Sequence, residues 1–290
     1  MWPDRPRILL SYAYAAPASK ADLAGMRADI LIDSGAFTAH TTGKAINIDA
    51  YTDWLAERAG TYTAAFALDV IGDPVASLRN YERQRARLPE SVTLIPTWHV
   101  GSDWSHLESL CSATDYVGIG GLVPLMGRSK LLMQYTVKAH VIARGRGARL
   151  HGLGITSYEV VNKLPWRSVD SSSWTYPSRF PLLYLAQRNG AIRSIVRGQK
   201  LGHRERALVR RYGINPSVVI NPNGTRQSVN PNAPSERRDA YLAAATRSYL
   251  VMEDALTQAG RDIRVYLAAT PSDAPELTRV HALGNPWAAA

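Results

Sequence analysis

Cysteine is the scarcest chemically informative residue in this chain of 290 residues, because Cys111 stands alone. A single cysteine cannot form a disulfide within the chain, and it excludes a cysteine-rich zinc site and a cysteine-ligated iron–sulfur cluster. Apolar runs are short as well, and none reaches the roughly 18 residues that a membrane-spanning helix needs. The first residues lack the charged region, long apolar stretch and cleavage site of a signal peptide. We therefore expect a cytoplasmic protein with no membrane partner.

Acidic residues are also in deficit, with 24 Asp and Glu against 34 Lys and Arg, which gives a formal net charge of +10. Such an excess favours a polyanionic partner, and a basic solvated surface is an equal alternative. The densest basic stretch is GHRERALVRRY at 202–212, which we predict to be a helix. Its arginines form either a phosphate-binding face or a solvated helix face. They are Arg204, Arg206, Arg210 and Arg211.

The hydropathy pattern predicts a parallel α/β fold. Short apolar stretches alternate with amphipathic stretches from Arg7 to Val169, at the spacing of strands and their crossover helices. About seven such repeats fit a TIM-type (β/α)8 barrel better than an open sheet. Two segments compete for the eighth strand, Phe180 to Ala186 and Ala191 to Val196.

The character of the sequence changes after Gly198. The basic helix is followed by a loop rich in Asn and Pro over 215–234, and then by a helical stretch over 235–258. We therefore divide the chain into a barrel domain over residues 1–200 and a helical and loop extension over residues 201–290 that packs on the barrel.

Polar or glycine residues follow most of the predicted strands. In a barrel the carboxyl ends of all strands meet at one mouth, where catalytic residues lie. One Asp after a strand is more often a helix cap or a turn residue, so the repetition is what indicates a site. These positions are Asp33, Asp69, His99, Gly120, Gly121, His151 and Asp170.

Several of these positions lie in motifs that resemble those of tRNA-guanine transglycosylases. DSGAF at 33–37 is similar to the DSGGF motif of that family, and GGL at 120–122 resembles its glycine pair after a barrel strand. HGLG at 151–154, followed by a helix and VDSS at 169–172, resembles the segment that leads to the nucleophilic Asp of the family. Order and spacing agree over roughly half of the chain.

Two departures point to a particular branch of this family. The tRNA-acting bacterial members hold zinc with three Cys and one His, and this chain has one Cys. The stretch WTYPSR at 174–179 does not match the Arg-Asn-Ala-Arg-like segment of those enzymes. The pattern, with HGLG present, is closer to the phage and bacterial branch that places 7-deazaguanines in DNA, and a phage-encoded member would act in the host cytoplasm.

The resemblance implies a role for each site residue. Asp170 would attack C1′ of the sugar as in retaining glycosidases, and Asp33 would move protons on the leaving and entering bases. Asp69 would accept hydrogen bonds from the base edge, while the amides of Gly120 and Gly121 would donate to O6. Phe37 would stack on a flipped base. His99, His151 and Gly152 would lie near the base pocket, and each histidine is equally well explained as a core residue.

The implied function is exchange of guanine in DNA for a 7-deazaguanine such as 7-cyano-7-deazaguanine, with no cofactor and with DNA and the free base as partners. Three alternatives stay open: a tRNA-acting transglycosylase, a metal-dependent hydrolase and a non-catalytic nucleic-acid-binding barrel. In the second, Asp33, His99, His151 and Asp170 would ligate a metal. The oligomeric state stays open as well.

Overall fold

The chain forms two compact units in the computed structural model, which describes residues 2–155, 157–220 and 235–288. The barrel unit consists of Arg5–Ser171 and Asp262–Pro275. The second unit consists of Met1–Asp4, Ser172–Arg261 and Glu276–Ala290. This division differs from the predicted boundary at residue 200, because a late segment returns to the sheet of the barrel unit.

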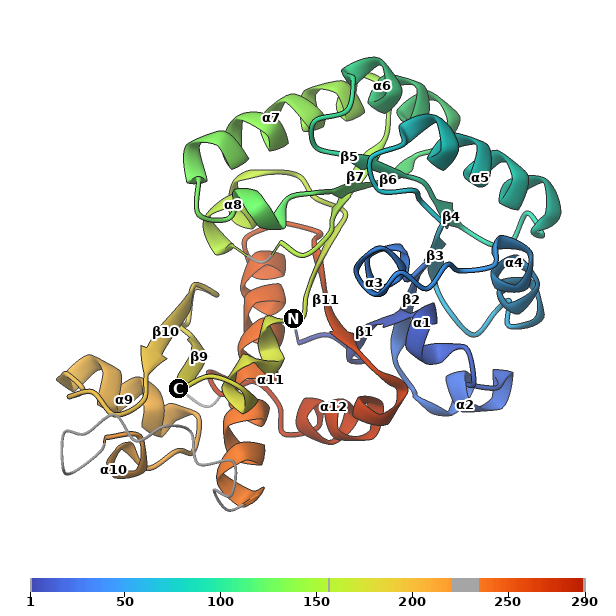
Figure 1. The fold of residues 1–290 in the computed structure, drawn as a ribbon. Helices are drawn as coiled ribbons and strands as arrows, with labels where there is room; N and C mark the ends of the chain where they lie inside the picture. Colours follow the sequence, from blue (N-terminus) through green and yellow to red (C-terminus); the bar gives the residue numbers. More distant parts are fainter. Residues whose placement is uncertain (1, 156, 221–234, 289–290) are drawn as a thin grey trace. The chain divides into compact units, whose positions relative to one another are not determined.

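The barrel unit contains a nearly closed parallel sheet of nine strands, of which β4 and β5 are two halves of one strand (Figure 1). Pro96 separates these halves, and a proline has no N–H for the ladder. β4 pairs with β3 while β5 pairs with β6, so the chain itself completes the ring. Counted in this way the sheet is the eight-stranded parallel arrangement of a TIM-type barrel, as predicted. The strands are β1 (Arg7–Ser11), β2 (Asp29–Asp33), β3 (Ala64–Phe66), β4 (Leu94–Ile95), β5 (Thr97–His99), β6 (Tyr116–Gly120), β7 (Arg149–Gly152), β8 (Ser168–Ser171) and β11 (Arg264–Ala269).

The eighth strand of the ring is β11, which pairs with β8 on one side and with β1 on the other. Both predicted candidates are wrong. They form β9 (Leu182–Ala186) and β10 (Ile192–Val196), which pair with each other as a separate antiparallel sheet. The short connection explains this, because it suits a hairpin, whereas a parallel pair needs a crossover of a dozen or more residues.

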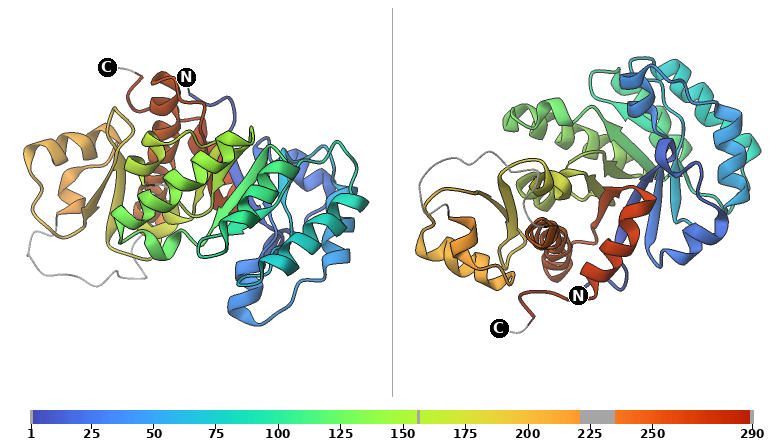
Figure 2. Two further views of the ribbon diagram at one scale, coloured as in Figure 1. Left: turned by 90° about the horizontal axis from the view of Figure 1, so that it is seen from above. Right: turned by 60° about the horizontal axis from the view of Figure 1, so that its bottom comes forward.

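Helices follow the strands of the barrel unit, and several of them begin at a capping side chain. Asn47, Asp73 and Asp103 each accept a hydrogen bond from a backbone amide in the first turn of the following helix. Figures 1 and 2 show α4 to α7 on the outer side of the strands. The helices are α1 (Tyr12–Ala15), α2 (Lys20–Gly25), α3 (Ala36–Thr42), α4 (Ile48–Glu57), α5 (Pro74–Arg87), α6 (Trp104–Ala113), α7 (Ser129–Gly145) and α8 (Tyr158–Lys163), with the 3-10 turns η1 (Val123–Leu125) and η3 (Pro271–Asp273).

Side chains from six strands, β1 to β4, β6 and β11, pack together as one core of the barrel unit. Small and large residues combine there, so that the rings of Phe66, Tyr116 and Tyr266 pack beside Ala64. The cluster consists of Leu9, Leu31, Ala64, Phe66, Ile95, Tyr116 and Tyr266. A filled interior of this kind leaves the ends of the strands as the place for chemistry.

The second unit has a core of its own, in which Leu183 and Leu185 of β9 pack with Val209 and Tyr241. Its elements are η2 (Ser173–Ser178), β9, β10, α9 (His203–Arg211), α10 (Pro216–Val219) and α11 (Ser235–Gln258), and α12 (Ala274–His281) spans the boundary between the units. The helices predicted over 202–212 and 235–258 are confirmed. The predicted loop over 215–234 contains α10, and its part from 221 lies outside the described residues. No helix in the described ranges is long and apolar enough to cross a membrane.

Candidate active site

Asp33 is the last residue of β2, and its Oδ2 accepts a hydrogen bond from the Gly35 amide at 2.9 Å. Gly35 has φ 83°, a conformation that suits glycine and turns the chain into α3. Burial and the negative charges of Asp69 and Asp170 together raise the pKa of Asp33 to about 6, against the lowering effect of hydrogen bonds from Ser11 and the Gly35 amide. The structure therefore brings three predicted carboxyl groups into electrostatic contact at the rim of the barrel.

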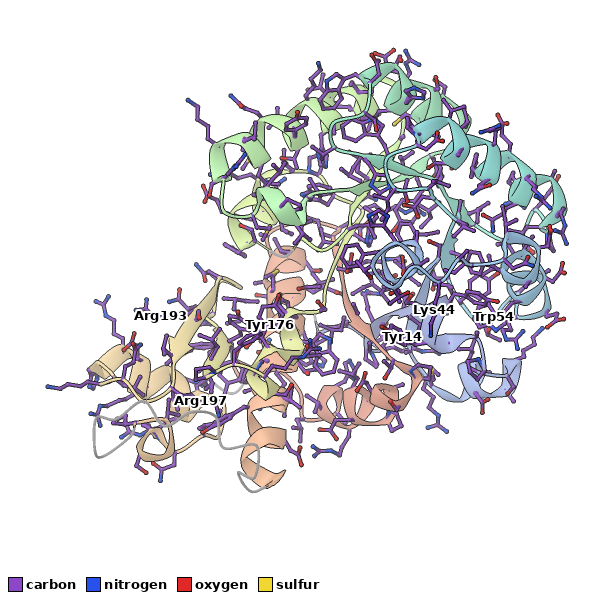
Figure 3. All side chains as sticks on the ribbon, in the orientation of Figure 1. Tyr14, Lys44, Trp54, Tyr176, Arg193 and Arg197 are labelled. Atoms are coloured by element: carbon purple, nitrogen blue, oxygen red, sulfur yellow. The ribbon has the colours of Figure 1, made fainter. Side chains whose placement is uncertain are left out.

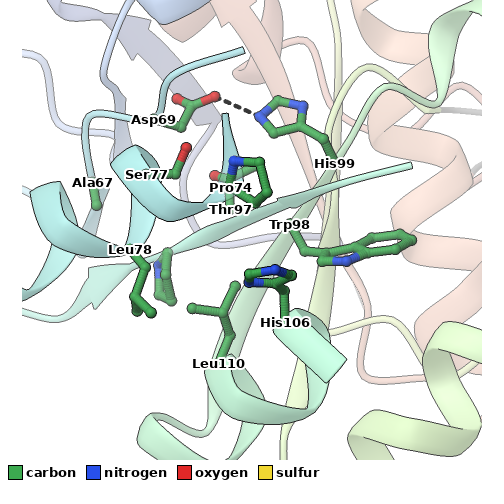
Figure 4. A pocket seen from close by; sticks show the side chains of 11 residues that line it. Ala67, Asp69, Pro74, Ser77, Leu78, Thr97, Trp98, His99, His106 and Leu110 are labelled. Carbon is green, nitrogen blue, oxygen red and sulfur yellow. Dashed lines mark hydrogen bonds and ion pairs between the residues drawn. The ribbon is translucent and has the colours of Figure 1, made fainter. Parts of the chain in front are cut away.

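Asp69 forms the first of two Asp–His pairs at this rim. Its Oδ2 lies 2.7 Å from Nε2 of His99 (Figure 4). Its Oδ1 accepts a hydrogen bond from the Ser34 hydroxyl at 3.2 Å. The side chains of Asp69 and His99 are 12% and 20% exposed, so this pair is open to solvent. Both residues also line a small pocket whose far side includes His106.

Gly120 lies opposite His99 in the register of β5 and β6. A Cβ on Gly120 would lie 2.7 Å from both Cε1 and Nδ1 of the His99 ring, closer than atoms of this kind approach. The glycine therefore makes room for the imidazole of the pair. The next residue, Gly121, has φ 75° and is exposed.

Asp170 forms the second pair and lies inside β8, one residue before its end. Its Oδ1 accepts a hydrogen bond from the Gly154 amide at 2.9 Å and lies 3.1 Å from Nε2 of His151. Asp170 is buried, and His151 is completely buried. Nδ1 of His151 lies 2.5 Å from the Ser168 hydroxyl, and this hydroxyl lies 2.5 Å from the hydroxyl of Tyr116.

These contacts form one hydrogen-bonded chain, Tyr116–Ser168–His151–Asp170, that we call the rim relay. A carboxylate only accepts, so Nε2 of His151 donates to Asp170. With a neutral imidazole, Nδ1 then accepts from Ser168, and the Ser168 oxygen accepts from Tyr116. Burial raises the pKa of Tyr116 above its usual range, so its hydroxyl keeps the proton that it donates. Every donor in the rim relay points toward Asp170, and this fixes both the tautomer and the orientation of the imidazole.

The remaining predicted barrel residues have different surroundings. Gly152 is buried in β7, where a Cβ would lie 2.3 Å from Cγ2 of Ile155 and 3.0 Å from Trp166, so tight packing explains this glycine. Phe37 lies in the first turn of α3 and its side chain is 71% exposed, which leaves the ring free to contact a ligand.

The four arginines of the basic stretch lie in the second unit and do not share one environment. Arg204 and Arg211 line a groove between α9 and neighbouring segments. Nε of Arg206 donates to the Leu201 carbonyl at 3.1 Å, which ties this side chain to the start of the helix. Arg210 is exposed and does not line the groove. The structure thus separates residues that the sequence presents as one group.

The geometry gives the metal-dependent alternative no ligand set. In the part of the chain that the structure describes, no three His, Cys, Asp or Glu side chains lie close enough together to hold a metal ion. The imidazole nitrogens that face carboxylates are engaged in the two pairs instead.

Four residues of this site were not singled out from the sequence: Ser34, Tyr116, Gly154 and Ser168. One signal was present for Ser168, because residues two apart in a strand face the same side, which places it on the side of Asp170. Tyr116 carries no such signal, since it is 52 residues away from Ser168 in the sequence.

Comparison with known proteins does not assign the chain to a family. A scan against protein-family models gives no match, and a search of curated proteins finds no similar sequence. The resemblance of the motifs to transglycosylases stays a prediction.

Proposed function

We propose that this protein is a transglycosylase that exchanges guanine in DNA for a 7-deazaguanine base, and that the exchange passes through a covalent link between Asp170 and the sugar. In the first half-reaction the Asp170 carboxylate attacks C1′. The bond from C1′ to guanine breaks, and its electron pair leaves with the base. Asp33 donates a proton to the departing guanine, and a glycosyl ester of Asp170 remains.

The second half-reaction reverses these roles. Asp33, now ionised, accepts a proton from the incoming base. The nitrogen of that base attacks C1′ and displaces the Asp170 carboxylate, which restores the enzyme. Each step conserves charge and atoms, so no oxidant or further co-reactant is needed.

The surroundings of the two carboxyl groups carry this proposal. A group that both donates and accepts a proton near neutral pH works best with a pKa near the working pH, and the pKa of Asp33 is raised to about 6. The nucleophile must instead be held in a fixed orientation, and Asp170 accepts hydrogen bonds from Gly154 and His151. Two neighbouring carboxyl groups thus have environments suited to different roles.

The open Asp–His pair supports a role in binding the base. Asp69 would accept hydrogen bonds from the N1 and amino edge of guanine or of a 7-deazaguanine, with His99 holding its carboxyl group. The exposed ring of Phe37 would stack on the flipped base, and the Gly120 and Gly121 amides would donate to O6.

The direct test is release of labelled guanine from DNA upon addition of 7-cyano-7-deazaguanine, followed by nucleoside analysis of the digested DNA. Without an incoming base, a denaturing gel should show a covalent protein–DNA species. Asp170→Asn should lose this species and at least about 10⁴-fold of the exchange rate, with DNA affinity unchanged, because the lost interaction belongs to the transition state.

Asp53→Asn is the matched control, since Asp53 is an exposed residue of α4 paired with Arg87 and should exchange bases at the normal rate. Exchange on tRNA in preference to DNA would overturn the choice of substrate. A covalent species that persists in Asp170→Asn would overturn the assignment of the nucleophile. DNA binding without any guanine release would leave the non-catalytic alternative.

A further inference from the structure

The second unit contains a groove whose lining combines cations with an indole ring. Arg204 and Arg211 come from α9, and Arg193 comes from β10 (Figure 3). Trp287 comes from the C-terminal segment, and Ala207 and Leu208 of α9 add an apolar surface. All of these residues belong to one compact unit, so the groove is a feature of that unit alone.

The charge of the groove is largely uncompensated. Its acidic residue, Glu205, is bound by the Arg193 guanidinium at 2.9 Å and by the Gly202 amide at 3.0 Å. Arg204 is exposed, and no ionic or hydrogen-bonded partner for its side chain occurs among the described residues. A net positive groove of this kind is complementary to phosphate.

The aromatic part of the groove is already arranged for stacking. The guanidinium carbon of Arg211 lies 4.8 Å from the centroid of the Trp287 ring. The indole nitrogen of Trp287 donates to the Ala186 carbonyl at 3.3 Å, which fixes the ring plane. Trp287 is partly buried against the core of this unit, and the exposed Arg211 guanidinium lies over its ring. An indole with a guanidinium stacked over it is the kind of platform on which unpaired bases stack.

We infer that this groove binds an unpaired nucleotide of single-stranded DNA, with a base on the Trp287–Arg211 platform and a phosphate on Arg204. A duplex offers phosphates but no free base face, and this favours a single strand as the occupant. The biological role of this binding rests on the proposed function, because a base that leaves the stack opens the DNA duplex locally. The binding itself does not depend on exchange.

Fluorescence anisotropy with a labelled single strand of roughly 12 nucleotides, a length within the usual site sizes, measures this binding. Arg204→Ala should weaken affinity and lower the slope of log Kd against log salt by about 0.7, the contribution of one phosphate contact on a single strand. Trp287→Leu should weaken affinity about tenfold and leave that slope unchanged, because stacking releases no counterion. Trp287→Phe, which keeps a ring, should restore most of the affinity.

Arg210→Ala is the matched control, because it removes the same charge from the same helix outside the groove, and it should leave both affinity and slope unchanged. Equal effects of Arg204→Ala and Arg210→Ala would overturn the inference. So would a preference for duplex DNA that Trp287→Leu does not alter, or a preference for RNA over DNA. Thermal unfolding of each variant excludes loss of the fold.

All of these measurements are made without an incoming base and are repeated with Asp170→Asn. Binding at the groove without any base exchange would contradict the proposed function and leave the inference standing. Base exchange by the wild type, together with normal DNA binding by the groove variants, would contradict the inference and leave the proposed function standing.

Discussion

The two Asp–His pairs at the rim of the barrel have the same composition and different surroundings. In the Asp69–His99 pair both side chains are partly exposed, and the imidazole packs against the glycine backbone at Gly120. In the Asp170–His151 pair the imidazole is completely buried, and both of its nitrogens face partners in the rim relay.

This difference suits the two pairs to different roles in the proposed reaction. A buried imidazole with both nitrogens engaged has none left for a substrate, so in the proposed mechanism His151 would position Asp170. A pair that is open to solvent can exchange water for the edge of a base, so in the proposed mechanism His99 would support recognition of the base. Loss of the first pair should therefore lower kcat, and loss of the second should raise KM.

After the proposed nucleophile Asp170, the largest effect is expected at Asp33, which interacts electrostatically with both pairs. Asp33→Asn should lower exchange by about 10²- to 10⁴-fold, because an amide does not transfer the proton. In the wild type, the rate of covalent adduct formation should fall about tenfold per pH unit above pH 6, as the protonated form of Asp33 is depleted. A stopped assay without incoming base measures this fall in rate with pH. The fall should be absent in Asp33→Asn.

The same variant should be more stable than the wild type above pH 6. The pKa of Asp33 is higher in the folded chain than its usual value of 3.8, so the folded state binds this proton more tightly. Stability from this group is complete below about pH 4 and is lost as the pH rises to about 6. Denaturant unfolding at pH 7.5 should show a gain on the order of 1–3 kcal/mol for Asp33→Asn. Equal stability of the wild type and Asp33→Asn at pH 7.5 would contradict the raised pKa.

The next effect concerns the rim relay. Ser168→Ala leaves Nδ1 of His151 without its donor, so the imidazole loses its fixed tautomer and Asp170 its orientation. We expect kcat to fall roughly 10- to 100-fold with KM little changed. Ser168→Thr keeps a hydroxyl and should recover much of the rate, and Tyr116→Phe should cost less than Ser168→Ala. A rise in KM at constant kcat would show that the buried pair takes part in recognition.

A smaller effect is expected at the open pair. His99→Ala should raise KM for the incoming base about tenfold, since Asp69 loses the partner that holds its carboxyl group, while kcat changes less. His106→Ala is the control, because His106 lines the same pocket and has no contact with the Asp69 carboxyl group among the described residues. A fall in kcat alone would place His99 in the chemistry and remove the contrast between the pairs.

The smallest effect is expected at Gly120, which packs against the His99 ring, in contrast to glycines that only form turns. Gly120→Ala introduces a methyl group that meets the His99 ring, and the partly exposed ring can tilt away. KM should rise roughly threefold to fivefold, which corresponds to about 0.6–1 kcal/mol. Gly127→Ala has no atom within 4 Å of the added Cβ and should match the wild type in steady-state kinetics.

Much of the barrel was predictable because its signals are local. Alternation of apolar strands and amphipathic helices follows from periodicities within a few turns of chain, and it predicted the barrel and most of its strands. Asp33, Asp69 and Asp170 were predicted for the same reason, since each lies at or near the end of a strand. The last strand was missed because RVYLAA is far from the other strands in sequence, and nothing local distinguishes it from β9.

The sequence by itself determined the parallel fold and the set of polar residues at one rim, because strands that run in parallel bring their carboxyl ends to the same edge of a sheet. Tertiary structure decided the surroundings of those residues. It buried His151 between Asp170 and Ser168 while leaving His99 open, and it placed Arg204 in a groove while Arg210 stayed outside. Burial and hydrogen-bond partners depend on residues far apart in the chain, as with Tyr116 and Ser168, and these fix tautomer, pKa and access to solvent.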